Sequence, residues 1–477
     1  MKKIVVGIMM LLLCFSVTGC AKKNEHGLSA KEPQTITIWH YYNGVQAIAF
    51  DELVMNFNNT VGMEKGIVVN SVGQGSIDDL VSALRDSSNK VIGAADMPNI
   101  FQSYSDVASE FDEMGVLANM EPYMTQEEKD KYITSYLQEG YIKNDQELKL
   151  FPVAKSSEVL IVNKTMWDKF AADTGAGTDD LATWEGLART AEKYYEWSDG
   201  KAFFGRDAFA NYMLIGSKQQ GKEIFQVTDG AVTLDFDRDA IQRLWDNYYV
   251  PYINGYYKHV GRYRSDDIKT GEIIAHVAAS TGSGYLPNEI TVGDDDSYPV
   301  EYMVLPVPNF EGTEKCVVQQ GASMAITKTD ETKEYASMVF LQWLAEPEQN
   351  IGFCVNSGYL PVQKAANDKE AVQKYIEEHG LEIGGVALDC LMTSIDQVNS
   401  YELYTSKGFE NGYEAREVLN TSMINLAMED RKSLDEMKNG TDKEAAKETY
   451  LTGEYFNQWY ELTLTELEKL CTPGESK

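Results

Sequence analysis

Few of the side chains that could catalyse a reaction stand at the spacing that a known chemistry requires. None of the five histidines forms an H-E-x-x-H motif or another metal-binding spacing. No G-x-S-x-G motif, which would place a catalytic serine on a sharp turn, occurs in the chain. The heptapeptide Gly216–Lys222 comes close to a phosphate-binding loop, but Glu223 replaces the hydroxyl residue that would hold Mg²⁺. This segment also follows a helical pattern rather than a strand. Because none of these motifs is complete, we expect no catalytic site, no metal and no cofactor.

The carboxylates are too numerous to identify a catalytic pair. With 74 Asp and Glu residues, pairs at the spacing of a glycosidase are inevitable, so a secreted glycoside hydrolase stays open as an alternative. Asp294, Asp295 and Asp296 could ligate calcium, but their segment lacks the spacing of an EF-hand loop. We interpret the three aspartates as part of a solvated loop.

The balance of charge excludes two classes of partner. The chain of 477 residues has 42 Lys and Arg against 74 Asp and Glu, which gives a formal net charge of −32. Nucleic-acid binding and electrostatic docking on anionic lipid both require clustered basic side chains, so we expect neither. Hydrophobic residues make up 43% of the chain, enough for a packed core. The length exceeds what one core usually supports, which predicts two or more lobes.

The N-terminus is typical of an export signal. Lys2 and Lys3 precede Ile4–Val17, a mostly apolar run of fourteen residues. Such a run is too short to span the ~30 Å hydrocarbon core of a membrane as a helix, and it fits the apolar region of a signal peptide. We predict that residues 1–19 are removed. Because that segment contains two lysines and no acids, the formal charge then changes from −32 to −34.

The apolar run ends at Val17–Cys20 (VTGC), which resembles a bacterial lipobox. In signals of this kind the cysteine sulfur receives a diacylglycerol, and cleavage falls just before the cysteine. We therefore predict a lipid on Cys20, followed by a flexible polar tether at residues 20–33. Two acyl chains give stable membrane anchoring where one chain is marginal. An ordinary signal peptide with an incidental cysteine stays open as the alternative.

Four further cysteines, Cys316, Cys354, Cys390 and Cys471, are scattered without a C-x-x-C motif. A zinc site is therefore not expected. An exported protein can contain a disulfide, but these spacings do not assign one. Buried free thiols are the favoured interpretation, and a single bridge stays open.

Strand and helix patterns alternate in the first part of the chain. Residues 35–39 alternate between polar and apolar side chains like a half-buried strand, and Phe50, Leu53, Val54 and Phe57 have the spacing of one helix face. This alternation predicts a mostly parallel α/β sheet. Further strands are expected at 67–69, 99–104, 158–162, 273–279, 302–305 and 322–327, and helices at 164–172, 183–197, 208–220, 237–249, 336–344 and through most of 409–470.

Several stretches together resemble the extracellular solute-binding proteins of ABC importers, the family that holds the maltose- and glycerol-3-phosphate-binding proteins. The resemblance covers most of residues 34–430. It rests on the order and spacing of the stretches downstream of the lipobox rather than on any one of them. The stretches are Ile38–His40, Phe151–Lys164, Gly261–Arg262 through Gly271 and Glu272 to Ala279–Ser283, and Gly321–Ser323 followed by Phe340–Pro347 and Gly358–Pro361.

The resemblance implies an α/β fold of two lobes, each a mostly parallel sheet flanked by helices, which close on a ligand between them. Ligands of open α/β sheets lie beyond the carboxyl ends of the strands, and pockets favour domain interfaces. Hinge crossings would join the lobes. The expected boundaries are 34–153 and 306–356 for the first lobe, 156–303 and 361–472 for the second, and crossings near 152–157, 303–308 and 356–361.

Polar and aromatic side chains that follow the expected strands are the candidate ligand contacts. Hydroxyls and backbone N–H groups suit both sugar hydroxyls and phosphate oxygens, and a tyrosine offers a ring face and a hydroxyl. Gly75 stands where glycerol-3-phosphate-binding relatives have a tyrosine, and Phe209 where relatives have a tryptophan. The resemblance places these residues in the cleft: His40, Tyr41, Gln74, Gly75, Tyr104, Ser156, Ser157, Asp207, Phe209, Ser280, Thr281, Gly282, Gly321, Tyr359 and Arg416.

Two of these residues separate two classes of ligand. Arg416 aligns with an arginine that contacts phosphate in the glycerol-3-phosphate-binding relatives, and its planar guanidinium suits an anion or several hydroxyls. Asp207 would instead accept hydrogen bonds from sugar hydroxyls. Arg416 could also belong to a surface ion pair with Glu414 or Glu417, and Phe209 could belong to the core.

The function implied by the resemblance is that of a lipid-anchored receptor on the extracellular face of a bacterial cell membrane, of Gram-positive type. Such a receptor captures a carbohydrate, here an oligosaccharide, by hinge closure and delivers it to the permease subunits of an ABC transporter. It is not an enzyme, and we expect a monomer. A glycerol-3-phosphate or glycerophosphodiester ligand stays open. The 28 tyrosines of the chain fit stacking on sugar rings.

Overall fold

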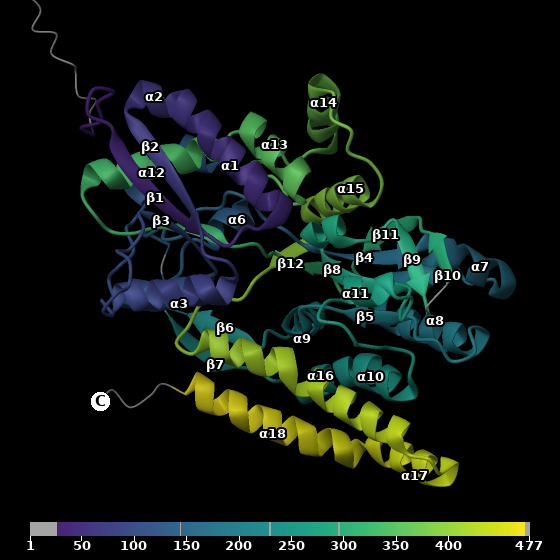
Figure 1. Ribbon diagram of the computed structural model, residues 1–477. Coiled ribbons are helices and arrows are strands. Elements are labelled where there is room, and N and C mark those ends of the chain that lie inside the picture. Colours follow the sequence, from purple (N-terminus) through teal and green to yellow (C-terminus); the bar gives the residue numbers. More distant parts are fainter. Residues whose placement is uncertain (1–25, 144, 229, 294–295, 473–477) are drawn as a thin grey trace, which may run out of the picture.

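The computed structural model describes residues 26–472 except 144, 229, 294 and 295 (Figure 1). The predicted signal peptide, Cys20 and the first part of the tether lie outside the described residues, as do Asp294 and Asp295. Two four-stranded sheets, each flanked by helices, lie side by side (Figure 1). The two-lobed α/β fold predicted from the sequence is therefore confirmed.

The first sheet has the mostly parallel arrangement that the sequence predicts. Its order is β13-β3-β1-β2, and β1 (Gln34–His40) pairs in parallel with β2 (Ile67–Gly73) and β3 (Ile100–Ser103). Ile36 of β1 is fully buried, as the alternating sequence requires. The antiparallel strand β13 (Ser323–Ile326) forms one edge. The flanking helices are α1 (Gly44–Asn59), α2 (Val61–Lys65), α3 (Ile77–Ser88), α4 (Ser105–Glu113), α12 (Glu331–Leu344) and α13 (Pro347–Ser357).

The second sheet is not mostly parallel, which corrects the expectation. In its order β11-β4-β8-β5, only β5 (Phe204–Arg206) and β8 (Ala275–Ala279) pair in parallel. β4 (Glu158–Asn163) is antiparallel to both β8 and β11 (Tyr302–Pro306). The reason is topological: β4 carries the chain away from the first lobe, whereas β8 and β11 carry it back toward the boundary between the lobes.

The remaining elements complete the two lobes and the boundary between them. They are α5 (Gln126–Lys129), α6 (Thr134–Gln138), α7 (Lys164–Thr174), α8 (Trp184–Trp197), α9 (Phe209–Gln219), β6 (Phe225–Thr228), β7 (Ala231–Leu234), α10 (Arg238–Asn254), α11 (Arg264–Lys269), β9 (Glu289–Val292), β10 (Asp296–Pro299), β12 (Cys316–Val318), α14 (Lys369–His379), α15 (Val386–Ser400), β14 (Glu402–Tyr404), α16 (Gly412–Glu436), α17 (Gly440–Tyr450), α18 (Gly453–Cys471) and the 3₁₀ helices Glu121–Tyr123, Thr178–Ala182 and Ser280–Tyr285.

Each lobe has its own hydrophobic core. In the second lobe the rings of Trp245 and Tyr249 on α10 stack with their centroids 3.7 Å apart, and Phe456 of α18 packs against Trp245. The helices α16 and α18 run side by side beneath α9 and α10 (Figure 1). In the first lobe Phe57 and Phe340 join α1 to α12. The long C-terminal helices are therefore part of the second lobe.

Three segments of the chain lie side by side at the boundary between the lobes. Backbone bridges join them, because Ser156 pairs with Gln320 and Lys155 pairs with Leu360. Such main-chain pairing fixes the three segments relative to one another, and the two lobes lie on either side of them. We call these the boundary segments: residues 151–157, 319–324 and 358–361.

Two of the expected crossings are displaced. The chain stays in the second lobe after β11, because Val317 of β12 packs in the core of that lobe, and it crosses only at residues 319–324 rather than at 303–308. The chain also returns to the first lobe after Leu360, since Val372 of α14 packs there. We therefore propose that α15, which contacts β4 and β11 of the second lobe, makes the third crossing.

The tether is shorter than expected. Leu28 is 2% exposed and packs in the core of the first lobe. The ring of His26 stacks on Tyr335 with the centroids 3.8 Å apart, and the His26 side chain lies 3.1 Å from a carboxylate oxygen of Glu331. An apolar leucine within a polar segment gains stability by burial, which explains why this part of the chain is packed.

The four cysteines of the described residues are buried free thiols. Burial raises the pKa of Cys316 and Cys390 to about 12 and that of Cys471 to about 11. These thiols therefore stay protonated at neutral pH and behave as small apolar groups. Of the two interpretations left open by the sequence, the structure has the free thiols.

Candidate ligand-binding site

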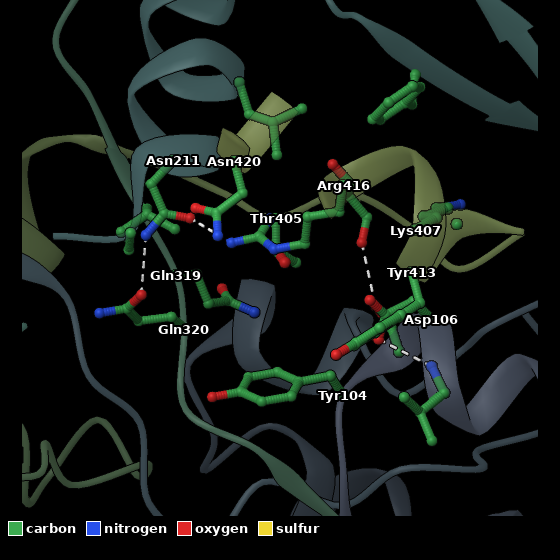
Figure 2. Close-up of a pocket in the computed structure, with 18 of the residues that line it drawn as sticks. Tyr104, Asp106, Asn211, Gln319, Gln320, Thr405, Lys407, Tyr413, Arg416 and Asn420 are labelled. Carbon is green, nitrogen blue, oxygen red and sulfur yellow. Dashed lines mark hydrogen bonds between the residues drawn. The ribbon is translucent and has the colours of Figure 1, made fainter. Parts of the chain in front are cut away.

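A cavity of about 480 Å³ lies between the two lobes. Its volume is in the range of small-molecule pockets, about 300–1,000 Å³. The first lobe contributes residues from the ends of β3 and α6 and the start of α3, whereas the second contributes α9, α16 and the loop after β14. Figure 2 shows Tyr104 and Gln319 facing Arg416 and Asn420 across this space. The polar residues that line it are Asp78, Tyr104, Ser105, Asp106, Glu139, Asn211, Gln319, Gln320, Tyr404, Thr405, Ser406, Lys407, Tyr413, Arg416, Glu417 and Asn420.

Arg416 is held in place by a short relay of hydrogen bonds. The amide nitrogen of Asn211 donates to Glu158 (2.7 Å) and to Gln320 (3.0 Å), which leaves its oxygen to accept from Nη2 of Arg416 at 2.5 Å (Figure 2). Within the described residues, Arg416 forms no ion pair and no other hydrogen bond. A guanidinium carries five N–H donors, so most of them are available to a ligand in the cavity.

Tyr104 lies at the N-cap of α4, directly after β3, and its ring borders the cavity. Its hydroxyl lies 3.2 Å from the hydroxyl of Tyr41, which follows β1. The parallel pairing of β1 with β3 brings the two strand ends together, as the rule for open α/β sheets predicts. Burial raises the pKa of both phenols, so they remain neutral groups that can donate and accept.

The carboxyl group of Asp106 lies in a part of the cavity where burial disfavours its charged form. Burial raises the pKa of its carboxyl group, although the backbone N–H of Val107 (2.8 Å) and the nearby charge of Arg416 both oppose the shift. A hydrogen bond from a ligand would stabilise this buried carboxylate relative to the cavity without ligand.

The cavity has more acidic than basic side chains. Asp78, Asp106, Glu139 and Glu417 line it, against Lys407 and Arg416. An excess of negative charge disfavours anionic ligands and favours groups that donate hydrogen bonds. Within the described residues, no three His, Cys, Asp or Glu side chains are grouped so as to hold a metal ion.

The two lobes also touch each other beside the cavity. The hydroxyl of Tyr413 on α16 donates to Asp78 on α3 at 3.0 Å, and Ser105 donates to the carbonyl oxygen of Ser406 at 3.1 Å. Away from the cavity, the hydroxyl of Tyr285 donates to the side-chain oxygen of Asn43 at 3.3 Å. These contacts join the two lobes.

Of the residues expected in the cleft, the structure places Tyr104 and Arg416 in the lining of this cavity, with Tyr41 beside Tyr104. Two serines lie in a boundary segment instead. The backbone N–H of Ser156 donates to Gln320, and the hydroxyl of Ser157 donates to the carbonyl oxygen of Val318 at 2.9 Å. These two serines therefore help to join the boundary segments between the lobes.

Other expected contacts pack near the boundary. The hydroxyl of Ser280 donates to the carbonyl oxygen of Gly358 at 3.1 Å, and Thr281 lies directly against the same glycine. Gly321 has φ +93° and passes over the backbone of Lys155, where a side chain would be strained. Gly282 lies beside Ala278, outside the residues that line the cavity.

The aromatic candidates are largely structural. His40 bonds to the hydroxyl of Ser71 at 2.8 Å, and burial lowers its pKa. Tyr359 stacks on Phe353, and Phe209 lies in the core of the second lobe. These rings are buried by neighbouring protein groups.

The last three candidates support the chain around them. The backbone N–H of Gln74 donates to the carbonyl oxygen of His40 at 2.8 Å. Gly75 has φ +92° at the turn into α3. Both carboxylate oxygens of Asp207 accept from the backbone N–H of Arg264, at 3.2 and 3.3 Å.

Sequence reasoning missed several residues of the lining. Asp106 follows Tyr104 by two positions, so the end of β3 was a usable signal for it. Asn211 lies inside a helix, Glu139 follows a short helix, and Gln320 lies in a boundary segment. No local pattern marks these three, because each reaches the cavity through contacts with residues far away in the chain.

A family model for bacterial extracellular solute-binding proteins matches residues 52–378. The chain belongs to this family. Its members are binding proteins, and the resemblance stated from the sequence is thus confirmed at the level of the family. Comparison with curated protein sequences finds no match. Among the described residues of this solute-binding protein, no helix is long and apolar enough to cross a membrane.

Solved structures share the fold over most of the chain. The cyclic α-maltosyl-1,6-maltose binding protein of Arthrobacter globiformis superposes with a TM-score of 0.66 at 16% identity, covering 91% of this chain and 100% of its own. UgpB of Mycobacterium tuberculosis, in complex with glycerophosphocholine, gives 0.64 at 16% identity and covers 91% and 99%. An ABC substrate-binding protein of Listeria monocytogenes in complex with cycloalternan gives 0.62 at 16%, covering 88% and 98%. These likenesses establish the shared two-lobed fold.

Proposed function

We propose that this solute-binding protein captures a carbohydrate, an oligosaccharide, between its lobes and delivers it to an ABC permease. The observation that carries the proposal is the cavity between Tyr104 and Arg416. There an aromatic ring, a guanidinium with unused donors and several carboxylates and amides face one cavity.

This mixture of groups suits a neutral polyol. A sugar presents many hydroxyls, each of which can donate and accept, and one apolar ring face. The carboxylates and amide oxygens of the cavity accept, the guanidinium donates, and the ring of Tyr104 offers a stacking surface. One structural neighbour binds cyclic α-maltosyl-1,6-maltose and another is a complex with cycloalternan, which supports the same class of ligand.

A ligand of this class raises the melting temperature. At about 100 times its Kd, a specific ligand adds about 2.7 kcal/mol to the free energy of unfolding. We expect at least one oligosaccharide in a panel of linear and cyclic glucans and other plant and bacterial oligosaccharides to shift the melt by several degrees. If no sugar in a broad panel shifts the melting temperature, the ligand class is wrong.

A glycerophosphodiester is the second candidate. Arg416 and Lys407 could contact a phosphate, and one structural neighbour is a complex with glycerophosphocholine. The acidic groups around Arg416 weigh against a simple phosphate such as glycerol-3-phosphate, because they repel its two negative charges. Adding glycerophosphocholine and glycerol-3-phosphate to the melting panel compares the two classes under one set of conditions.

We further propose that a lipid on Cys20 holds the receptor on the outer face of the cell membrane of a Gram-positive bacterium, as a monomer. After removal of residues 1–19, a net charge of −34 gives no electrostatic attraction to anionic lipid, so attachment falls to the acyl chains. Between Cys20 and the packed ring of His26, the chain reaches at most about 20 Å at ~3.3 Å per residue. The receptor would therefore stand close to the membrane surface.

Replacing Cys20 with serine releases the protein. We expect Cys20→Ser to move from the membrane fraction to the culture medium or the soluble fraction, because no sulfur remains to take the lipid. The matched control is Cys14→Ser, which alters the cysteine inside the predicted signal peptide and leaves the protein in the membrane fraction. Retention of Cys20→Ser in the membrane fraction would contradict the lipoprotein assignment.

A further inference from the structure

Glu139 stands where the cavity meets the boundary segments. It follows α6, its side chain is 4% exposed, and it is part of the cavity lining. Its Oε2 accepts two hydrogen bonds of 2.6 Å, one from Nζ of Lys155 and one from Nε2 of Gln319. These two donors belong to different boundary segments, so one carboxylate oxygen of Glu139 ties both segments to the first lobe.

Lys155 extends the connection to the third boundary segment. Its side chain is fully buried, and its ammonium group also donates to the carbonyl oxygen of Gly321 at 2.8 Å. Its backbone exchanges hydrogen bonds with Leu360, at 3.1 and 2.6 Å. A buried ammonium depends strongly on its carboxylate partner, because an unpaired charge in the interior is unstable. The position of Glu139 therefore affects all three boundary segments.

The other carboxylate oxygen of Glu139 has no such role. Within the described residues, Oε1 of Glu139 forms no hydrogen bond, although the residue lines the cavity. An ionised carboxylate can accept several hydrogen bonds, so Oε1 is an open acceptor for a donor on a ligand. A sugar hydroxyl supplies such a donor, whereas a phosphate dianion does not.

We propose that Glu139 is both a ligand contact and the residue that couples the ligand to the hinge between the lobes. A hydroxyl bound at Oε1 orients the carboxylate whose Oε2 holds Lys155 and Gln319, and it thereby fixes the boundary segments in the arrangement of the structure. The inference rests on the proposed function in one respect: it takes the ligand to be a neutral compound rich in hydroxyls.

If the pair of Glu139 and Lys155 had only a structural role, a different result would be expected. Removing it would lower the melting temperature but would change neither the distance between the lobes nor the affinity for ligand. Coupling requires both to change, since the apparent affinity falls with the fraction of molecules in the binding-competent arrangement. Two readouts, the radius of gyration without ligand and the Kd, therefore separate the two roles.

The experiment uses the full mature chain and three variants. Glu139→Gln keeps the shape and removes the charge. The double variant Glu139→Gln/Lys155→Met also removes the buried ammonium, so that a folded protein remains where the single variant is too unstable. Asp112→Asn is the matched control, because Asp112 forms largely buried ion pairs with Lys149 (3.2 Å) and Lys143 (3.1 Å) in the same lobe, away from the cavity.

Small-angle X-ray scattering without ligand measures the first readout. We expect a larger radius of gyration for the double variant than for wild type and Asp112→Asn, because the boundary segments lose their common anchor. An unchanged radius of gyration in the folded double variant overturns the proposal. This measurement needs no ligand, so it stands even if the proposed function fails.

Calorimetric titration with maltotriose, or with the oligosaccharide that gives the largest melting shift, measures the second. We expect Glu139→Gln, or the double variant, to raise the Kd about 10- to 100-fold, the loss of one hydrogen bond to a charged group. Asp112→Asn should bind like wild type. An unchanged Kd overturns the proposal, whereas a wild-type protein that binds no oligosaccharide contradicts the proposed function and leaves the hinge result to decide the coupling.

Discussion

Replacing Arg416 with alanine weakens the binding of a sugar about 10- to 100-fold and reduces the binding of a phosphate-containing ligand below detection. The guanidinium lines the cavity and donates one hydrogen bond, to the side-chain oxygen of Asn211, so its other donors are available. One hydrogen bond from a charged donor contributes about 1.5–3 kcal/mol, which corresponds to the loss for a neutral sugar. A phosphate depends on a bidentate contact and on the charge itself, so its loss is larger.

Arg431 provides the matched control for this substitution. It lies on the same helix, where it pairs with Asp435 (2.9 Å) outside the cavity. We expect Arg431→Ala to bind both ligand classes like wild type when affinity is measured by calorimetric titration. Equal affinities of Arg416→Ala and wild type for every ligand would remove Arg416 from the site. Loss restricted to glycerophosphodiesters would favour the second candidate.

Replacing Asp106 with asparagine makes the protein without ligand more stable and makes ligand binding about 10- to 100-fold weaker. Burial raises the pKa of this carboxyl group above its ordinary value of 3.8, so its ionised form is disfavoured in the folded protein. Asparagine has nearly the same shape and carries no charge, which removes that penalty. It is also a weaker acceptor for a sugar hydroxyl than a carboxylate, which explains the loss of affinity.

The pH dependence gives this prediction a sign. A carboxyl group whose pKa is raised on folding binds more protons in the folded than in the unfolded state, so its contribution to stability is present below pH 3.8 and is lost as the pH rises through its folded-state pKa. In urea unfolding, the advantage of Asp106→Asn over wild type should therefore grow as the pH rises through that interval.

Asp430 serves as the control for affinity. Burial also raises the pKa of its carboxyl group, but it accepts hydrogen bonds from Tyr249 and Tyr455 (2.8 Å), away from the cavity. We expect Asp430→Asn to leave the Kd unchanged. If Asp106→Asn neither stabilises the protein nor weakens binding, Asp106 is not part of the site in the way we propose.

The sequence was sufficient for those parts of the fold that local patterns specify. The alternation at 35–39 predicted β1, and the order of short motifs predicted the two lobes. The direction of β4 was not predictable in this way, because it depends on where the chain enters the second lobe. The crossing at 319–324 was missed for a similar reason. The chain adds β12 to the second lobe before it crosses, and a strand of three residues has too short a sequence pattern to be predicted.

The candidate site was predictable where a side chain follows a strand or matches a motif. Tyr104 ends β3, and Arg416 came from the resemblance to the family. Glu139 and Asn211 were not predictable, because their roles arise from partners in other segments of the chain. The partners of Glu139 are Lys155 and Gln319, and those of Asn211 are Glu158 and Arg416. Hydroxyl residues such as Ser157 were misleading, since a hydroxyl serves equally well to bond the backbone of a boundary segment.

The most direct test is a crystal structure of the protein purified under native conditions, with the ligand that it retains from the cell. We expect electron density for a carbohydrate between the lobes, with hydroxyls within hydrogen-bonding distance of Arg416 and a ring against Tyr104. A ligand of another class in that cavity, or a carbohydrate bound elsewhere on the molecule, would contradict it.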